Sequence, residues 1–203
     1  MRREELDELH YITPIDNVVS ILSSGILSHQ LAAKVHHTSV AMQEVQDIRM
    51  NKVVPGTNGR RLHDYANLYI SARNPMLYKR KDVHVDLCIL RISTAILDIE
   101  GVIVTDRNAA ASIASFRRPA AGLALVDREQ VFADDWRHPG DELEYYRHRS
   151  IKCAEVLVPH RIPPTYIIGA YVSCIQSQAA LLAVAPDLGV TIDPHFFFLE
   201  VHQ

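Results

Sequence analysis

The stretch Cys153-Ala154-Glu155-Val156-Leu157-Val158-Pro159 places one charged residue, Glu155, inside a continuous apolar run. A short apolar run of this kind predicts a buried β-strand, and Pro159, which has no backbone N–H for the sheet, predicts where that strand ends. Because burying an isolated charge costs several kcal/mol, an ionised carboxylate here must lie at an edge, be paired or have a function. Two interpretations of Glu155 stay open: a structural ion pair, or a catalytic carboxylate at the rim of the sheet.

The segments around this strand mix further strands and helices. The other predicted strands are 66–72, 86–92, 102–104, 166–174 and 196–201. Helices are predicted at 14–24, from 39 to about 50, and at 108–116, 141–152 and 175–183. The first helix has Thr13 as its N-cap, Pro14 at its first position and Gly25 at its end. Because these elements do not alternate as regular βαβ units, we expect an α+β fold.

Length and composition indicate a single domain over residues 1–203. With 48% hydrophobic and 22% charged residues, the chain is neither disordered nor collagen-like. No apolar run approaches the roughly 18–20 residues of a membrane span, so we expect no membrane partner. The N-terminal residues are charged where a secretory signal is apolar, so we expect a cytoplasmic protein. The three cysteines are too widely spaced for a disulfide framework or a Cys-x-x-Cys site.

Positive charge is concentrated in residues 49–81. This segment holds eight Lys or Arg residues and one acidic residue, although the net charge of the chain is −3. Its Pro-, Gly- and Asn-rich part, residues 51–61, predicts an exposed loop. A cationic surface on an acidic body is typical of proteins that bind a polyanion or a phosphate-bearing cofactor. The alternative is a solvated basic loop without a partner.

Two parts of the basic segment carry candidate binding groups. Arg49 is predicted at the end of a helix, just before the loop, where its guanidinium can hold phosphate oxygens through paired hydrogen bonds, although on spacing alone such a position is more often that of a surface residue. The segment from Leu62 to Tyr78 is dense in aromatic and hydrogen-bonding side chains that can stack on bases. Its alternative interpretation is a strand and turn whose tyrosines face the core.

The eleven histidines raise the question of a metal site. His63-Asp64 resembles the His-Asp pair of a metal-dependent phosphohydrolase. No His or Cys spacing typical of a metal site accompanies it, so we expect no metal. The sequence also has no Gly-x-Gly-x-x-Gly, Walker or Gly-x-Ser-x-Gly motif. A nucleotide, if bound, is held by some other arrangement.

Four groups of residues, taken in order, resemble the DarT family of DNA ADP-ribosyltransferase toxins. They are Tyr11-Ile12-Thr13 with Asp16-Asn17, Ile21-Leu22 and Gly25-Ile26-Leu27; Leu62-His63-Asp64-Tyr65 with Asn67-Leu68-Tyr69 and Arg73-Asn74-Pro75-Met76-Leu77-Tyr78; Thr105-Asp106-Arg107-Asn108-Ala109-Ala110; and Ala154-Glu155-Val156-Leu157-Val158-Pro159. Together they cover most of the chain, from about residue 9 to 174.

The resemblance implies an ADP-ribosyltransferase fold, with two small packed β-sheets, surrounding helices and an NAD cleft. It implies that Glu155 and Arg49 are the catalytic residues. Around NAD it implies Tyr11, Thr13, Asn17 and His10, although the family's His-x-Thr start is changed here because Tyr11 takes the place of the histidine. The nucleic acid is expected to contact Lys52, Arg60, Arg61, His63, Tyr65, Tyr69, Arg73 and Tyr78.

The activity implied by the resemblance is transfer of ADP-ribose from NAD to a thymine or guanine base of single-stranded DNA. The same resemblance implies a toxin whose partner is a macrodomain antitoxin. Two alternatives remain at this point: an ADP-ribosyltransferase that acts on RNA or protein, and a non-catalytic nucleic-acid-binding module.

Overall fold

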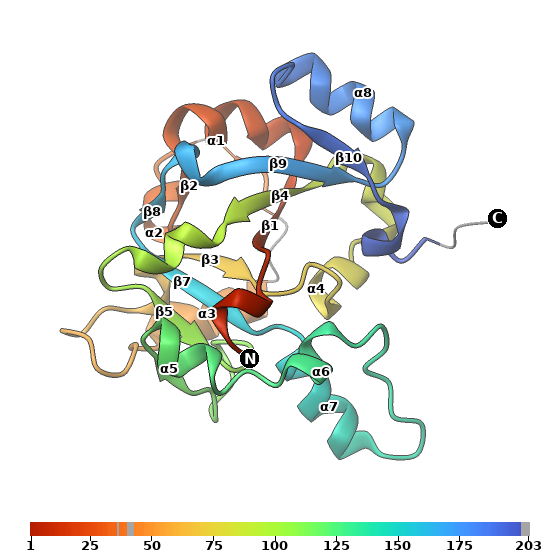
Figure 1. Cartoon of the computed structure of the whole chain (residues 1–203). Helices are drawn as coiled ribbons and strands as arrows, with labels where there is room; N and C mark the ends of the chain where they lie inside the picture. The colour runs from red at the N-terminus through yellow and green to blue at the C-terminus, as the bar shows by residue number, and fades with distance from the viewer. Residues whose placement is uncertain (36, 40–42, 200–203) are drawn as a thin grey trace.

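The computed structural model describes residues 1–35, 37–39 and 43–199, and its centre is an eight-stranded sheet (Figure 1). The strand order is β10-β9-β4-β1-β3-β7-β5-β6, and a separate two-stranded sheet pairs β2 with β8. The bounds are β1 (Glu8–Pro14), β2 (Ile26–Leu27), β3 (Tyr65–Tyr69), β4 (Leu87–Ser93), β5 (Ile103–Thr105), β6 (Phe116–Arg117), β7 (Glu155–Pro159), β8 (Arg161–Ile162), β9 (Ile167–Val172) and β10 (Val190–Ile192). Neighbouring strands are antiparallel, except β9 and β10.

The large sheet consists of two four-stranded halves that meet at a narrow seam. At the seam, β1 and β3 pair through one residue pair, His10 with Tyr69. By contrast, β1 pairs with β4 over seven residues and β3 pairs with β7 over five. The α+β fold is therefore confirmed. The two small sheets expected from the resemblance are the halves β10-β9-β4-β1 and β3-β7-β5-β6, which the single pair joins into one sheet.

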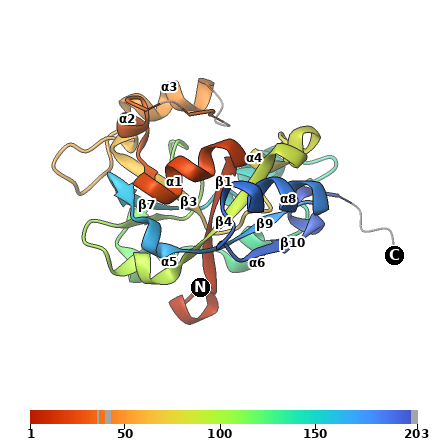
Figure 2. The same ribbon diagram turned by 90° about the horizontal axis from the view of Figure 1, so that it is seen from above.

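Helices surround both halves (Figures 1 and 2). Their bounds are α1 (Val18–Ser24), α2 (His29–Ala32), α3 (Gln43–Asn51), α4 (Pro75–Tyr78), α5 (Pro119–Leu123), α6 (Arg128–Phe132), α7 (Glu142–Ile151) and α8 (Ile175–Val184). Helix α1 packs with α8 beside β9 and β4, whereas α2 and α3 lie together next to the short 3-10 helix η3 (Leu62–Asp64). The largest core cluster fills one face of the sheet with buried side chains such as Leu68, Leu90 and Val156.

The first predicted helix begins later than expected. Thr13 and Pro14 belong to β1, and a 3-10 turn, Ile15–Asn17, precedes α1. Pro14 suits a strand end as well as a helix start, because its ψ of 144° continues the extended backbone. The predicted end is confirmed: Gly25 has a φ of 85°, and a Cβ there would lie 2.3 Å from the carbonyl oxygen of Ile162.

The predicted helix at 108–116 is wrong, because the segment is a loop that leads into β6. Asp106 Oδ1 accepts from the backbone N–H of Ser115 at 2.8 Å, and Asn108 Oδ1 accepts from that of Ala110 at 2.8 Å. The N–H of Ala109 is taken by Glu155. Of these, the Ser115 N–H is one that a helix over 108–116 would use internally, and its bond to Asp106 replaces that helical bond, so the alanine-rich composition does not decide the conformation.

The predicted strand at 196–201 is also wrong over its described part. Pro194–Phe197 form a 3-10 helix whose N-cap, Asp193, accepts from the N–H of His195, and β10 replaces the expected strand. Residues 200 and 201 lie outside the described residues. The other strands are confirmed within a few residues of their predicted positions, as are α7 and α8. Helix α3 confirms the second predicted helix, although residues 40–42 of that prediction lie outside the described residues.

Candidate active site

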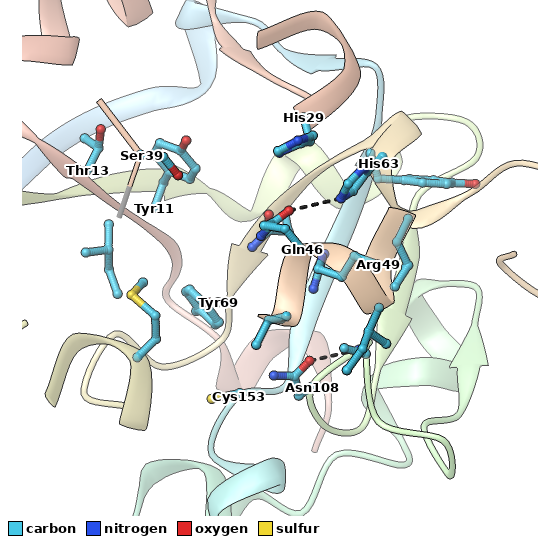
Figure 3. A pocket seen from close by; sticks show the side chains of 18 of the residues that line it. Tyr11, Thr13, His29, Ser39, Gln46, Arg49, His63, Tyr69, Asn108 and Cys153 are labelled. Carbon is cyan, nitrogen blue, oxygen red and sulfur yellow. Dashed lines mark hydrogen bonds between the residues drawn. The ribbon is translucent and has the colours of Figure 1, made fainter. Parts of the chain in front are cut away.

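A cavity of about 640 Å³ lies beside the seam between the two halves of the sheet (Figure 3). Its walls include Tyr11 and Thr13 from β1, Asn67 and Tyr69 from β3, and Arg49 from α3. The volume lies within the range of pockets that bury most of a small-molecule ligand. Two strands that diverge after one residue pair leave room between their side chains, so the seam itself explains why a cavity forms here.

Arg49 and Glu155 meet at this cavity although they are far apart in sequence. Arg49 Nη1 lies 3.1 Å from Glu155 Oε1 and 3.0 Å from Oε2, and the backbone N–H of Ala109 donates to Oε1 at 3.0 Å. Glu155 is 1% exposed and Arg49 is 6% exposed. The guanidinium lines the cavity, and the carboxylate lies directly behind it. The pair therefore compensates the buried charge of Glu155 and also presents Arg49 to a ligand.

Tyr69 lies next to this pair. It is the cross-strand partner of Glu155, so both side chains are on the same face of the β3–β7 ladder. Burial raises the pKa of the Tyr69 hydroxyl well above its ordinary value, and the negative charge of Glu155 adds to this effect. Tyr69 therefore stays a neutral hydrogen-bond donor at any working pH.

The strand β1 and the turn after it form the opposite wall. Tyr11 and Thr13 both line the cavity, and burial raises the pKa of the Tyr11 hydroxyl to about 12. Asn17 Nδ2 donates to Thr13 Oγ1 at 3.2 Å and to the carbonyl of Thr38 at 2.8 Å, while Asn17 Oδ1 accepts from the Thr38 N–H at 3.0 Å. Through these bonds to Thr38, Asn17 holds residues 37–39 at the edge of the cavity.

His10, which was predicted beside NAD, does not line the cavity. Because successive side chains of a strand point to opposite faces, His10 lies on the other side of the sheet from Tyr11. It is 4% exposed, its Nδ1 is 3.2 Å from the carbonyl of Ile70, and its Nε2 is 3.3 Å from Glu8 Oε1. The ring packs near Phe196.

Two stacked histidines form another part of the wall. The rings of His29 and His63 are 4.0 Å apart, and His63 Nε2 is 3.1 Å from Gln46 Oε1. Burial, then the charges of His29 and Arg49, lower the pKa of His63 to about 4, so both rings present a neutral aromatic surface at neutral pH. The sequence analysis predicted His63 but missed His29, because the four residues of helix α2 give no periodic signal. It also missed Gln46, although the helix that carries it, α3, was predicted.

The predicted basic contacts mostly lie outside the cavity. Lys52 donates to the carbonyl of Ala111 and lies over the Phe116 ring, 5.3 Å from its centroid. Arg60 and Arg61 are in the turn after α3, where Arg61 is exposed. Arg73 faces the C-terminal part instead, where it donates to the carbonyl of His195 and lies 4.2 Å from the Phe198 ring centroid. The charge excess of residues 49–81 is therefore divided between several faces.

The three predicted tyrosines have different environments. Tyr65 is 2% exposed and packs in an apolar cluster, but it also contributes to the cavity wall. Tyr69 lines the cavity. Tyr78 is 41% exposed and makes edge contacts with Trp136 and Phe198, outside the cavity lining. Of the three, Tyr65 and Tyr69 line the cavity and Tyr78 does not.

The cavity has a further wall that the sequence analysis missed. Helix α7 contributes Tyr146, Arg149 and Ser150, and the loop before β6 contributes Asn108. A helix at 141–152 was predicted, but not its role in the cavity; in the structure Asp141 is its N-cap. Tyr146 and Arg149 are three residues apart and share one face of the helix, but only tertiary packing places that face at the cavity.

Other kinds of site receive no support from the part of the chain that the structure describes. Over residues 1–35, 37–39 and 43–199, no group of three or more His, Cys, Asp or Glu side chains is arranged to hold a metal ion. Within the same ranges, no helix combines the length and apolar character needed to cross a bilayer.

Comparisons with known proteins point to one family. A family model described as "DarT: ssDNA thymidine ADP-ribosyltransferase, DarT" matches residues 10–198. A Thermosipho africanus protein named DNA ADP-ribosyl transferase-DNA ADP-ribosyl glycohydrolase fusion protein is 34% identical over 205 residues. That match covers 95% of this chain and 50% of the fusion, so the chain spans about half of that relative. A DNA ADP-ribosyl transferase of a Thermus species is 31% identical, over 76% of each chain.

Solved structures agree with this result. Thermus sp. 2.9 DarT in complex with ADP-ribosylated ssDNA has a TM-score of 0.84 at 26% identity, over 96% of this chain and 97% of that one. The same protein in complex with NAD+ has a TM-score of 0.78, over 96% and 98%. Thermosipho africanus DarTG in complex with ADP-ribose has a TM-score of 0.81 at 31% identity, over 95% of this chain and 51% of that one.

Proposed function

The chain belongs to the DarT family of ADP-ribosyltransferases, and from this premise we propose that it transfers ADP-ribose from NAD+ to a base of single-stranded DNA. The observation that carries the proposal for this chain is the contact between Arg49 and Glu155 at the wall of a cavity large enough for a dinucleotide. The printed names of the relatives supply the substrates, and the residues around the cavity supply the chemistry.

NAD+ is proposed to occupy the cavity between β1 and α3. Tyr11, Thr13 and Asn17 form the wall on the side of β1, where backbone groups of Tyr11 can hold the nicotinamide amide whatever its side chain. Arg49 has N–H donors beyond Nη1, and these can hold pyrophosphate oxygens in a paired geometry. The neutral rings of His29 and His63 provide an apolar aromatic surface for a flat group of the ligand.

The reaction breaks the bond between nicotinamide and ribose. Positive, oxocarbenium-like charge develops on the ribose as nicotinamide leaves with the electron pair of that bond. A nearby carboxylate, Glu155, stabilises this charge more in the transition state than in the ground state. A nitrogen of the acceptor base then forms a bond to the ribose carbon, and Glu155 takes the proton that this nitrogen loses once Arg49, which separates the carboxylate from the cavity, turns towards the phosphates. Arg49 fixes the carboxylate and the phosphates in place, which is a positioning effect.

The acceptor is proposed to be a thymine or a guanine. Single-stranded DNA suits the reaction, because a base inside a duplex cannot reach a sugar held in a cavity. The partner is proposed to be a macrodomain antitoxin that removes ADP-ribose from DNA, consistent with the glycohydrolase part in the name of the Thermosipho fusion relative. We assign the reaction to the cytoplasm, where NAD+ and DNA occur together.

The test is incubation of the purified chain with labelled NAD+ and single-stranded oligonucleotides that each contain one type of base. We expect label on the thymine or the guanine oligonucleotide and release of nicotinamide in equal amount. Label on RNA or on protein, with every DNA oligonucleotide unlabelled, would exclude DNA as the acceptor. Oligonucleotide binding without any use of NAD+ would instead identify a binding module.

A further inference from the structure

Strand β5 ends beside the residue that carries the proposed catalytic carboxylate. Its ladder with β7 ends at the pair of Val104 and Val156, so Thr105 and Glu155 are the next residues on the two strands. At this position the Thr105 hydroxyl accepts from the backbone N–H of Glu155 at 3.2 Å. The hydroxyl thus supplies a hydrogen bond to a buried backbone group just where the ladder stops.

The same hydroxyl also fixes the start of the loop after β5. It donates to the carbonyl of Arg107 at 2.7 Å. Further along this loop, the backbone N–H of Ala109 donates to Glu155 Oε1 at 3.0 Å. Thr105 therefore contacts both parts of the structure that decide where the carboxylate lies: the strand that carries Glu155 and the loop that donates to it.

This loop, residues 106–115, is closed by a second side chain. Asp106 Oδ1 accepts from the N–H of Ser115 at 2.8 Å, which joins the two ends of the loop. Asp106 Oδ2 accepts from Arg107 Nε at 2.9 Å, so the closing carboxylate is itself held in place. Hydrogen bonds of this kind keep the Ala109 N–H directed at the carboxylate of Glu155.

Thr105 fixes this geometry without reaching the cavity. It is 0% exposed and is not among the residues that line the cavity. Without its hydroxyl, the N–H of Glu155 would be buried without this partner, which is unfavourable and favours a shift of the strand end. A displacement of about 1 Å near a reacting group can cost about 10²-fold in rate. The effect of Thr105 on the reaction is therefore indirect and acts through Glu155.

We propose that Thr105 is a positioning residue, whose hydroxyl sets where the Glu155 carboxylate lies relative to Arg49 and the cavity. This inference rests on the proposed function, in which Glu155 stabilises the charge on the ribose and takes the proton of the acceptor base. The contribution comes from the hydroxyl and not from the methyl group, because only the oxygen bonds to Glu155 and Arg107. A purely structural Thr105 would instead affect the stability of the fold and leave the rate per folded molecule unchanged.

The experiment compares Thr105→Val, Thr105→Ser and a matched control, Ser177→Ala. Valine keeps the branched shape of threonine without the hydroxyl, and serine keeps the hydroxyl without the methyl group. Ser177 of α8 is also 0% exposed, and its hydroxyl donates to the backbone carbonyl of Val85 at 2.9 Å, beside the other half of the sheet. We expect Thr105→Val to lower kcat for transfer by about 10–100-fold, with KM for NAD+ close to wild type. Thr105→Ser should recover most of the loss, and Ser177→Ala should keep the wild-type kcat.

A wild-type kcat in Thr105→Val, or a loss of equal size in Thr105→Ser or in Ser177→Ala, would overturn the inference. If Thr105→Val does not fold, Asp106→Ala takes its place, because this change opens the same loop where its two ends meet. Asp106→Ala should lower kcat and leave KM for NAD+ close to wild type, and an unchanged kcat there would count against the inference in the same way.

Amide hydrogen exchange separates this inference from the proposed function. In Thr105→Val, the amides of Ala109 and Glu155 should exchange faster relative to the slowest amides of the same protein, whereas in Ser177→Ala they should not. Exchange at both amides as slow as in the wild type would overturn the positioning role. If the wild type transfers ADP-ribose to no acceptor, the proposed function fails, while these two amides still decide whether Thr105 positions the carboxylate.

Discussion

Among the residues that the structure describes, two carboxylates are buried beside arginines, one in each half of the sheet, and their environments differ. Glu8 of β1 accepts from Arg91 Nε at 2.6 Å, lies 3.3 Å from His10 Nε2 and also accepts from Tyr171. Glu155 of β7 is held by Arg49 and the N–H of Ala109. Both residues are less than a tenth exposed. Burial and an arginine partner are thus common to both sites.

The difference lies in what the arginine faces. Arg49 lines the cavity, whereas Arg91 lies outside the cavity lining and over the ring of Tyr171, 4.9 Å from its centroid. Glu8 is enclosed by side chains that hydrogen-bond to its charged form. The comparison teaches that a buried ion pair identifies a candidate site only together with a cavity, since the same residue types elsewhere stabilise the fold. Three measurements test this distinction.

The largest expected difference is in catalysis. Glu155→Gln keeps the size of the side chain and its ability to accept from Ala109, but it removes the negative charge. We expect transfer to fall by about 10²–10⁴-fold, the usual contribution of a positioned acid or base. Glu8→Gln should leave the rate per folded molecule unchanged. The measurement is single-turnover transfer of labelled ADP-ribose, with circular dichroism to check folding; equal loss in both variants would remove the distinction.

The second difference is in stability and its dependence on pH. Burial alone would raise the pKa of Glu8, but hydrogen bonds from His10, Arg91 and Tyr171 outweigh it and lower the pKa from 4.5 to about 2. A lowered pKa means that this stabilisation is fully present above pH 4.5 and is lost as the pH falls towards 2. At pH 7 it amounts to about 3 kcal/mol.

Urea denaturation of wild type and Glu8→Gln checks this expectation. The free energy of unfolding of the variant should be lower at pH 7, and the gap should narrow as the pH falls below 4.5. A gap that stays constant with pH would show that the variant loses packing rather than charge interactions.

The smallest expected difference is in the binding of NAD+. A ligand at a hundred times its Kd stabilises the folded state by about 2.7 kcal/mol, which appears as a higher melting temperature. Arg49→Lys cannot make paired hydrogen bonds to phosphate, so a tenfold weaker affinity and a loss of about 1.4 kcal/mol of that stabilisation are expected. Arg91→Lys should keep the full shift. If NAD+ raises the melting temperature of wild type, Arg49→Lys and Arg91→Lys equally, Arg49 does not belong to the NAD+ site.

The sequence was sufficient for most of the fold because the deciding patterns are local. The strand around Glu155 is visible as an apolar run, and helix α7 lies within one residue of its predicted bounds, 141–152. The segment 108–116 was not predictable in this way, because the N–H of Ala109 binds a carboxylate 46 residues later in the chain. A distant partner outweighs local propensity there.

The candidate site was predictable in part. Glu155 was identified as a charge in an apolar strand. Arg49 was identified as a candidate phosphate-binding residue, and the family resemblance implied its catalytic role. Tyr146 and His29 were not predictable, since each lies on an element whose distance from the cavity depends on tertiary packing. Tyr65 and Arg73 were predicted from residue type, but one packs in the core and the other contacts the C-terminal segment.

The seam between the halves of the sheet also has a dynamic consequence. A net backbone hydrogen bond is worth about 0.5–1.5 kcal/mol, so the one residue pair between His10 and Tyr69 is a weak restraint on breathing of β1 against β3. The seven pairs between β1 and β4 are a much stronger restraint. Slight rotation of one half against the other changes the width of the cavity without breaking either ladder. Amide hydrogen exchange will therefore be fastest among the central strands at the seam, and occupation of the cavity will slow it there.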